Sequence, residues 1–169
     1  MSNIYVLGAG MVGSAMAIDL AKKHHVTISD ISSEVLSRVV EKEPSLKTEI
    51  LDVTDTKDLA SKIKDADLVL SAVPGFLGFE TLKKIILQGK NTVDISFFPE
   101  NALELNQLAL ENNVTAIVDC GVAPGMDNVI LGYYNETHDI DFFECLVGGL
   151  PKVKKWPFCY KAPFSPVDV

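Results

Sequence analysis

The sequence Gly8-Ala9-Gly10-Met11-Val12-Gly13 has the spacing G-x-G-x-x-G. An apolar run at residues 4–7 precedes it, and residues 11–23 follow it with apolar side chains at helical spacing. A strand, a glycine turn and a helix in this order are typical of the phosphate-binding unit of dinucleotide-binding proteins. The first glycine permits the tight turn, the second lets the backbone approach a pyrophosphate, and the third lets the helix pack closely on the strand. This context favours dinucleotide binding over a glycine turn with a structural role alone.

An acidic residue, Asp30, ends the next apolar run, which covers residues 26–29. A carboxylate in this place accepts hydrogen bonds from ribose hydroxyls and repels a 2′-phosphate. Residues 31–33 contain no basic side chain, and Arg38 is the one arginine of the chain. The sequence therefore predicts NAD as the cofactor, and it leaves NADP open because two serines follow Asp30. A helix cap is the alternative role of Asp30.

Strand-like and helix-like segments alternate along residues 1–136. The expected strands are 4–7, 26–29, 48–51, 68–73, 92–95 and 114–118, and the number is left at six or seven because residues 142–147 are a candidate for one more. The expected helices are 11–23, 32–40, 55–63, 77–87, 101–110 and 125–134. This alternation predicts a doubly wound, parallel α/β sheet, the Rossmann fold, and right-handed crossovers give it the strand order 3-2-1-4-5-6.

The C-terminal part of the sequence has a different character. Residues 152–169 place three prolines among aromatic side chains, which is unusual in a solvated linker. We expect a dinucleotide-binding domain at 1–136 and the start of an incomplete substrate or catalytic domain at 137–169.

Further cofactor contacts are expected where the strands end, because ligands of such sheets bind beyond the carboxyl ends of the strands. Asp52 and Val53 follow the third strand and would border the adenine, although a turn is an equally good interpretation of Asp52. The turn after the fourth strand would pass close to the pyrophosphate and the nicotinamide ribose. The expected cofactor-binding residues are Gly8, Gly10, Met11, Val12, Gly13, Asp30, Asp52, Val53, Ala72, Val73, Pro74 and Ser96.

A second glycine-rich loop, at residues 119–127, follows the sixth strand and leads into a helix. Its N–H groups would hold a nicotinamide carboxamide or a substrate carboxylate, and a crossover into a second domain is an equally good interpretation. Asp119 is the candidate catalytic residue, with a cap of the loop as its alternative role. The expected substrate-binding residues are Gly121, Pro124, Gly125 and Met126.

Composition excludes several classes of protein. The net charge is −8, with 23 acidic against 15 basic residues, which argues against nucleic acid or an anionic membrane as a partner. No apolar segment reaches the roughly 18 residues that a membrane helix needs. Three widely spaced cysteines build neither a disulfide framework nor a zinc pair, so we expect no metal site and a cytoplasmic location.

Three motifs of the chain together resemble the saccharopine dehydrogenase and lysine 6-dehydrogenase-like oxidoreductases. They are Gly8 to Gly13 with Asp30, Val93-Asp94-Ile95-Ser96, and Asp119-Cys120-Gly121-Val122-Ala123-Pro124-Gly125-Met126. The segments Val147-Gly148-Gly149-Leu150-Pro151 and Tyr160-Lys161-Ala162-Pro163-Phe164-Ser165-Pro166 also look like the beginning of the family's catalytic domain.

This resemblance implies an NAD(P)-dependent oxidoreductase that acts on a C–N bond of an amino acid. A neutral amine carbon would lose hydride to the nicotinamide, and water would hydrolyse the resulting imine. Members of the family are longer, so we expect a fragment that carries the cofactor domain and turns over little alone. A non-catalytic, nucleotide-sensing module is the alternative function, and the sequence leaves a homo-oligomer open.

Overall fold

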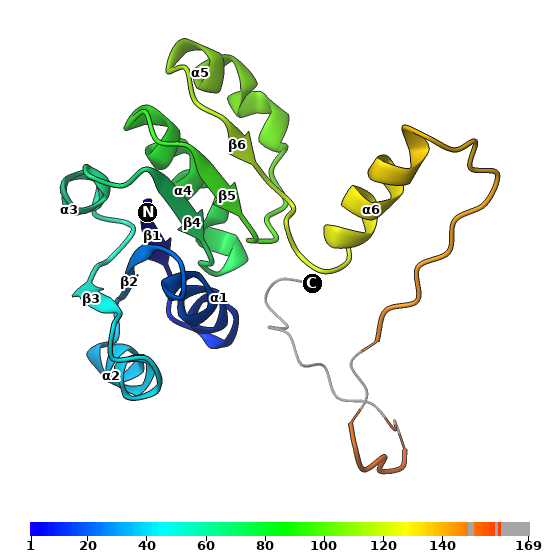
Figure 1. Cartoon of the computed structure of the whole chain (residues 1–169), viewed down its shortest axis with the longest axis horizontal. Coiled ribbons are helices and arrows are strands. Elements are labelled where there is room, and N and C mark those ends of the chain that lie inside the picture. The colour runs from blue at the N-terminus through cyan, green and yellow to red at the C-terminus, as the bar shows by residue number, and fades with distance from the viewer. Residues whose placement is uncertain (149–150, 158, 160–169) are drawn as a thin grey trace. The chain divides into compact units, whose positions relative to one another are not determined.

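The computed structural model describes residues 1–148, 151–157 and 159. Six parallel strands form one sheet, in the order β3-β2-β1-β4-β5-β6 (Figure 1). The strands are β1 (Asn3–Leu7), β2 (His25–Asp30), β3 (Lys47–Ile50), β4 (Leu68–Ser71), β5 (Thr92–Asp94) and β6 (Ala116–Ile117). The predicted α/β fold and its strand order are therefore confirmed.

Helices connect the strands, and side chains cap α2 and α3 among them. The helices are α1 (Met11–Ala21), α2 (Ser33–Lys42), α3 (Thr56–Ile63), α4 (Gly75–Leu87), the 3-10 turn η1 (Ala102–Leu105), α5 (Asn106–Glu111) and α6 (Met126–Asn135). Ser32 caps α2 by accepting the Val35 N–H, and Asp55 caps α3. The helix expected at 101–110 is divided because the Asn101 side chain accepts the Leu103 N–H and tightens the first turn into η1.

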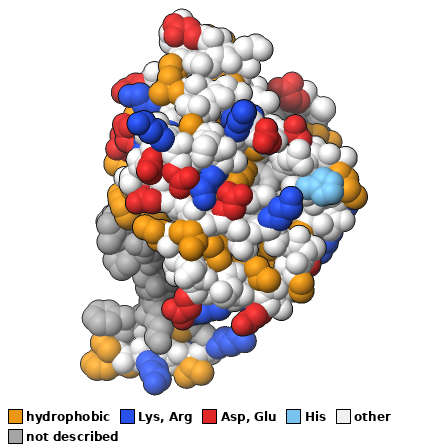
Figure 2. All heavy atoms as spheres, turned by 90° about the vertical axis from the view of Figure 1, so that its left-hand side faces the viewer, with side chains coloured by type: hydrophobic (Ala, Val, Ile, Leu, Met, Phe, Trp, Pro, Cys, Tyr) orange, Lys and Arg blue, Asp and Glu red, His pale blue; other side chains and the backbone are white. Residues whose placement is uncertain are grey.

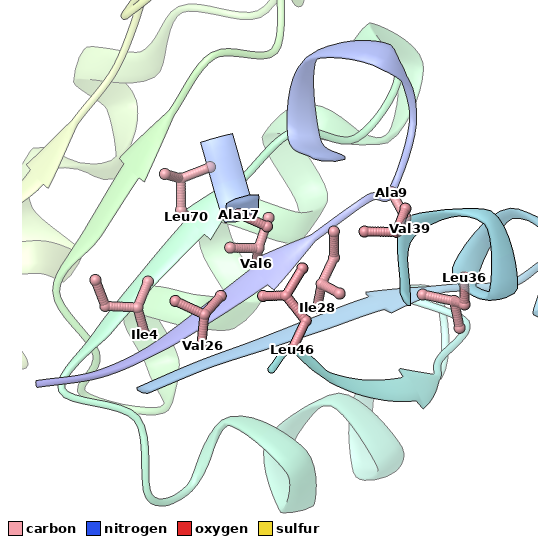
Figure 3. Close-up of a cluster of buried hydrophobic side chains, with 10 residues drawn as sticks. All are labelled: Ile4, Val6, Ala9, Ala17, Val26, Ile28, Leu36, Val39, Leu46 and Leu70. Atoms are coloured by element: carbon pink, nitrogen blue, oxygen red, sulfur yellow. The ribbon is translucent and has the colours of Figure 1, made fainter. Parts of the chain in front are cut away.

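Apolar side chains cover both faces of the central strand. Ile4 and Val6 of β1 belong to a cluster that α1 and α2 complete, as Figure 3 shows. Tyr5 and Leu7 point to the other face, where α3 and α4 pack. Because successive side chains of a strand alternate, burial of all four places β1 between two layers of helices.

The structure divides the chain into two units, Met1–Asp119 and Cys120–Val169. All three apolar clusters formed by the described residues lie in the first unit. In the described part of the second unit, α6 buries none of its side chains. The division lies before the boundary expected at 136 and 137, and a second domain that starts at 137 stays a prediction.

The C-terminal strands differ from their expected bounds, although the sixth strand itself is confirmed. The strand expected at 114–118 is limited to Ala116–Ile117, and residues 142–147 form no strand. A strand requires a neighbour for its backbone groups, and no described segment pairs with 142–147. The expected family motif at 160–166, and Gly149 and Leu150 of the motif before it, lie outside the described residues.

The surface in Figure 2 carries acidic and basic side chains interspersed with uncharged ones. Ion pairs on the first unit, such as Lys22 with Asp19 at 2.7 Å, join such neighbours. In the described part of the chain, no helix is both long enough and apolar enough to cross a membrane.

Candidate dinucleotide site

The glycine loop joins β1 to α1 and needs glycine at two of its three positions. Gly8 has a φ of +93°, and a Cβ on it would lie 2.5 Å from the carbonyl oxygen of Ala72. A Cβ on Gly13 would lie 2.0 Å from the carbonyl oxygen of Gly8, so glycine alone lets α1 approach β1. A Cβ on Gly10 would meet nothing within 4 Å, which leaves space at the start of α1. The observed loop has the shape that the spacing predicts.

The start of α1 offers N–H groups to an anion. Gly10 is the N-cap and provides no side-chain hydrogen bond, and the first turn contains no acidic side chain. Met11 and Val12 are exposed there, whereas Gly13 is buried. N–H groups of a first helical turn have no partner within the helix, and the helix dipole adds positive potential. These features fit the pyrophosphate of a dinucleotide.

Asp30 connects the glycine loop to the end of β2. One carboxylate oxygen accepts the Ala9 N–H at 2.9 Å, and the other accepts the Ser32 N–H at 2.9 Å. Ser32, not Asp30, is the N-cap of α2, so the alternative role as a helix cap is not what the structure shows. A carboxylate has about four acceptor positions, so Asp30 retains capacity for ribose hydroxyls.

The loop after β3 lies beside Asp30, because the Leu51 N–H donates to the Asp30 carbonyl at 3.1 Å. Asp52 accepts the N–H and the hydroxyl of Thr54, at 2.9 and 2.7 Å, and these bonds lower the pKa of Asp52. The interpretation of Asp52 as a turn residue therefore holds, and its contact with adenine stays a prediction. Val53 is half-buried and packs against the apolar cluster of Tyr5.

The turn after β4 lies against the glycine loop. The Ala72 N–H donates to the Leu7 carbonyl at 2.8 Å, and the Ala72 carbonyl oxygen is the atom that a side chain at Gly8 would meet. Pro74 is the N-cap of α4 and, like Gly10, provides no side-chain cap. The Val73 side chain belongs to the buried core, so a cofactor contact of Val73 would come from its backbone.

The end of β5 contains a buried acid that sequence reasoning did not select as a site residue. Asp94 is fully buried and accepts the N–H of Ser96 at 2.7 Å and its hydroxyl at 3.2 Å. Burial raises the pKa of Asp94, these bonds oppose the rise, and the charge of Asp119 adds to it. The buried Ser71 hydroxyl, which makes no hydrogen bond within the described residues, also favours the charged form of Asp94 and so lowers its pKa. The pattern Asp-x-Ser directly after an apolar run was the available signal.

Ser96 is itself buried, and its hydroxyl is bonded to Asp94. A Cβ on Gly78 of α4 would lie 2.8 Å from the Ser96 Cβ, so the turn fits against a glycine of this helix. The predicted cofactor contact of Ser96 therefore requires its backbone or a rearranged hydroxyl.

Asp119 ends the first unit, is exposed, and has a φ of +56°. Asp94 ends β5 and Asp119 follows the neighbouring strand β6, and the charge of Asp119 contributes to the raised pKa of Asp94. The catalytic role of Asp119 stays a prediction.

The loop of the second unit closes on itself. The Met126 N–H donates to the Gly121 carbonyl at 2.9 Å, and the Gly125 N–H donates to Asp127 at 2.7 Å. Gly125 has a φ of +143°, and a Cβ there would lie 2.2 Å from the Gly121 carbonyl oxygen. These N–H groups, expected to meet a substrate carboxylate, are bonded within the loop. Substrate binding by Gly121, Pro124, Gly125 and Met126 stays a prediction.

A hollow of about 340 Å³ lies at the amino ends of β1 to β3 and contains none of the predicted site residues. Its polar side chains bond one another, since the Tyr5 hydroxyl donates to Glu49 at 2.9 Å and Lys62 lies 3.8 Å from the same oxygen. Ligands of such sheets bind at the opposite edge, where the glycine loop lies.

Comparisons with known proteins agree with this geometry. The family described as saccharopine dehydrogenase NADP binding domain matches residues 4–117, which lie within the first unit. The saccharopine dehydrogenase [NADP(+), L-glutamate-forming] of Pyricularia oryzae is 28% identical over 96% of this chain and 38% of its own length. The protein of that name from Schizosaccharomyces pombe is 26% identical over 89% of this chain and 35% of its own length.

A solved structure shares both sequence and fold. The apo saccharopine dehydrogenase (L-Glu forming) from Saccharomyces cerevisiae is 26% identical, with a TM-score of 0.69 over 82% of this chain and 32% of that one. The chain thus spans between 32% and 38% of the length of these three relatives. The matches confirm the predicted resemblance, and they make the first unit a pyridine-nucleotide-binding domain.

Proposed function

The chain belongs to the saccharopine dehydrogenase NADP-binding domain family, and from this premise we propose that it is the cofactor-binding part of an NAD(P)-dependent oxidoreductase. The proposed reaction is at a C–N bond of an amino acid, the chemistry that the resemblance implies. The observation that carries the proposal is the uncapped start of α1, with space at Gly10 and with Asp30 bonded to the loop beside it.

A bound nicotinamide would supply the acceptor for hydride from the amine carbon. The chain's own residues bind and orient it. The N–H groups after Gly10 hold the pyrophosphate, and Asp30 accepts from the adenosine ribose. Asp119 is the proposed proton acceptor that keeps the substrate amine neutral, because a protonated amine has no lone pair to drive hydride loss.

We also propose a preference for NAD over NADP. The Asp30 carboxylate would lie close to a 2′-phosphate, and repulsion between two anions disfavours that ligand. Arg38 does not offset this charge in the structure, because its guanidinium pairs with Glu34 one turn earlier on α2. This preference would distinguish the chain from the two relatives whose names specify NADP(+).

Thermal melting with each nucleotide tests both proposals. At 100 times its Kd a ligand adds about 2.7 kcal/mol of stability, or roughly 5–10 °C in Tm for a chain of this size. We expect this shift with NAD and a smaller one with NADP. Asp30→Ala should weaken NAD binding by about 1–3 kcal/mol, and Ser33→Ala, on the same connection, should not.

Each outcome has a separate meaning. No shift with either nucleotide would contradict dinucleotide binding, whereas a larger shift with NADP would overturn the NAD preference alone. Reduction of NAD with lysine, saccharopine and other amino acids tests the substrate class on the full-length protein. Tight binding without turnover of any amine would favour the nucleotide-sensing alternative. We propose a cytoplasmic location from the cysteine usage.

A further inference from the structure

We propose that Lys84 of α4 is a positioning residue for the adenine side of the nucleotide site. It would act through the loop that joins β3 to α3, at residues 51–55. The inference rests on the proposed function, because it assumes that a dinucleotide binds along the carboxyl ends of the strands. It assigns a role to a lysine that no sequence motif selects.

The 51–55 loop is hydrogen-bonded to the site at Leu51, and its later residues are hydrogen-bonded to one another. The Leu51 N–H donates to the Asp30 carbonyl, so the loop starts beside the acid proposed to bind the ribose. The N–H groups of Thr54 and Asp55 turn inward, to the Asp52 carboxylate and carbonyl. Neither the Val53 nor the Thr54 carbonyl accepts a backbone N–H in the described part of the chain.

Lys84 supplies the hydrogen bonds that these two carbonyls lack. Its Nζ lies 3.0 Å from the Val53 oxygen and 3.0 Å from the Thr54 oxygen, and the side chain is half-buried. An ammonium group has three donors, so one lysine can hold both oxygens in one arrangement. The side chain thereby fixes the two successive peptide groups that flank Thr54, Val53–Thr54 and Thr54–Asp55.

The position of Lys84 on α4 connects two parts of the site. The N-cap of this helix, Pro74, belongs to the turn that lies against the glycine loop. Its last turn holds the loop in which Asp52 and Val53 are expected to border the adenine. The distance between the pyrophosphate region and the adenine region is therefore set by one rigid element.

Lys90 provides a matched control within the same chain. It lies in the connection from α4 to β5 and donates to the carbonyls of Lys64 and Ala66, in the connection from α3 to β4. The chemistry is the same, an ammonium on two loop carbonyls. That connection leads into the amino end of β4, however, at the edge of the sheet opposite the glycine loop. A role limited to stability predicts similar effects of the two lysines on ligand binding.

Isothermal calorimetry on the full chain distinguishes positioning from stability. The variants are Lys84→Met, Lys84→Arg and Lys90→Met, and the ligands are NAD, ADP and nicotinamide mononucleotide. We expect Lys84→Met to weaken NAD and ADP roughly tenfold and to leave nicotinamide mononucleotide unchanged. Lys84→Arg should restore ADP affinity to within about twofold, because it retains the donors. Lys90→Met should bind all three ligands as the wild type does.

The inference is overturned if Lys84→Met binds ADP like the wild type, or if Lys90→Met loses as much ADP affinity as Lys84→Met. A Lys84→Arg variant as weak as Lys84→Met overturns it also, and this variant keeps the test open should Lys84→Met not fold. A wild type that binds neither NAD nor ADP refutes the proposed function itself, so the two failures are distinguishable.

Discussion

The two units of this chain differ in how far local pattern determines structure. In Met1–Asp119, strands and helices bury Val6, Ile28, Leu59 and Ile85 almost completely. In the described part of the second unit, the apolar side chains of α6 and of residues 142–148 stay largely exposed. The apolar side chains of a helix or strand are therefore buried only where the same unit provides an apolar surface for them to pack against. Measurements that perturb equivalent features of the two units test this difference.

The largest effect is expected from a side chain at Gly13. Gly13→Val would place a Cβ 2.0 Å from the Gly8 carbonyl oxygen and force α1 away from β1. We expect a loss of about 4 kcal/mol or more in the free energy of unfolding, measured in urea, together with the loss of nucleotide binding. Gly132→Ala in α6 is the matched control, because a Cβ there meets nothing within 4 Å. It should cost no stability, and an equal loss at both glycines would remove the distinction between the units.

A smaller effect is expected from truncating a side chain in each unit. Ile28 is fully buried between β1 and α2, so Ile28→Ala should lower the unfolding free energy by about 3 kcal/mol. Val129 of α6 is 67% exposed, so Val129→Ala should change it by less than about 0.5 kcal/mol. Equilibrium unfolding of both variants in urea provides the measurement. A large loss at Val129 would mean that α6 is packed in solution.

The smallest effect concerns the buried Asp94. Its pKa is raised above the ordinary 3.8, so the folded chain holds this proton more tightly than the unfolded chain. Wild-type stability should therefore fall as pH rises through and above about 4, until Asp94 is ionised in the folded state. Asp94→Asn removes this dependence, so the unfolding free energy of the wild type should rise relative to that of the variant when the pH is lowered from 7 to 4. A constant difference across that range would contradict the assignment.

The sequence predicted the sheet well because its signals were local and repeated. Glycine at 8 and 13 required the turn, the apolar runs at regular intervals gave the strands, and right-handed crossovers gave their order. Strand ends were harder to predict, since the exposure of a residue just past a strand depends on the turn that follows it. Val73 and Ser96 were expected to face a cofactor, yet one side chain is in the core and the other is bonded to Asp94.

The site was predictable in its glycine loop and at Asp30, where motif and spacing coincide. The contacts that organise it come from elsewhere in the sequence. Lys84 lies about 30 residues along the sequence from the carbonyls that it binds. The sequence around a lysine on a helix does not indicate which distant residue it will contact. The same holds for Gly78, whose missing side chain makes room for Ser96. Such pairs arise from tertiary packing, which periodicity in one sequence does not encode.

The bond from Ala9 to Asp30 bears on the thermodynamics of ligand capture. This hydrogen bond fixes the conformation of the glycine loop within the protein itself, so a ligand that binds there does not have to order the loop. A receptor that is already ordered loses less conformational entropy on complex formation and retains more of its contact energy as affinity. Asp30, the residue proposed to bind the ribose, therefore also fixes the conformation of the glycine loop through the Ala9 N–H.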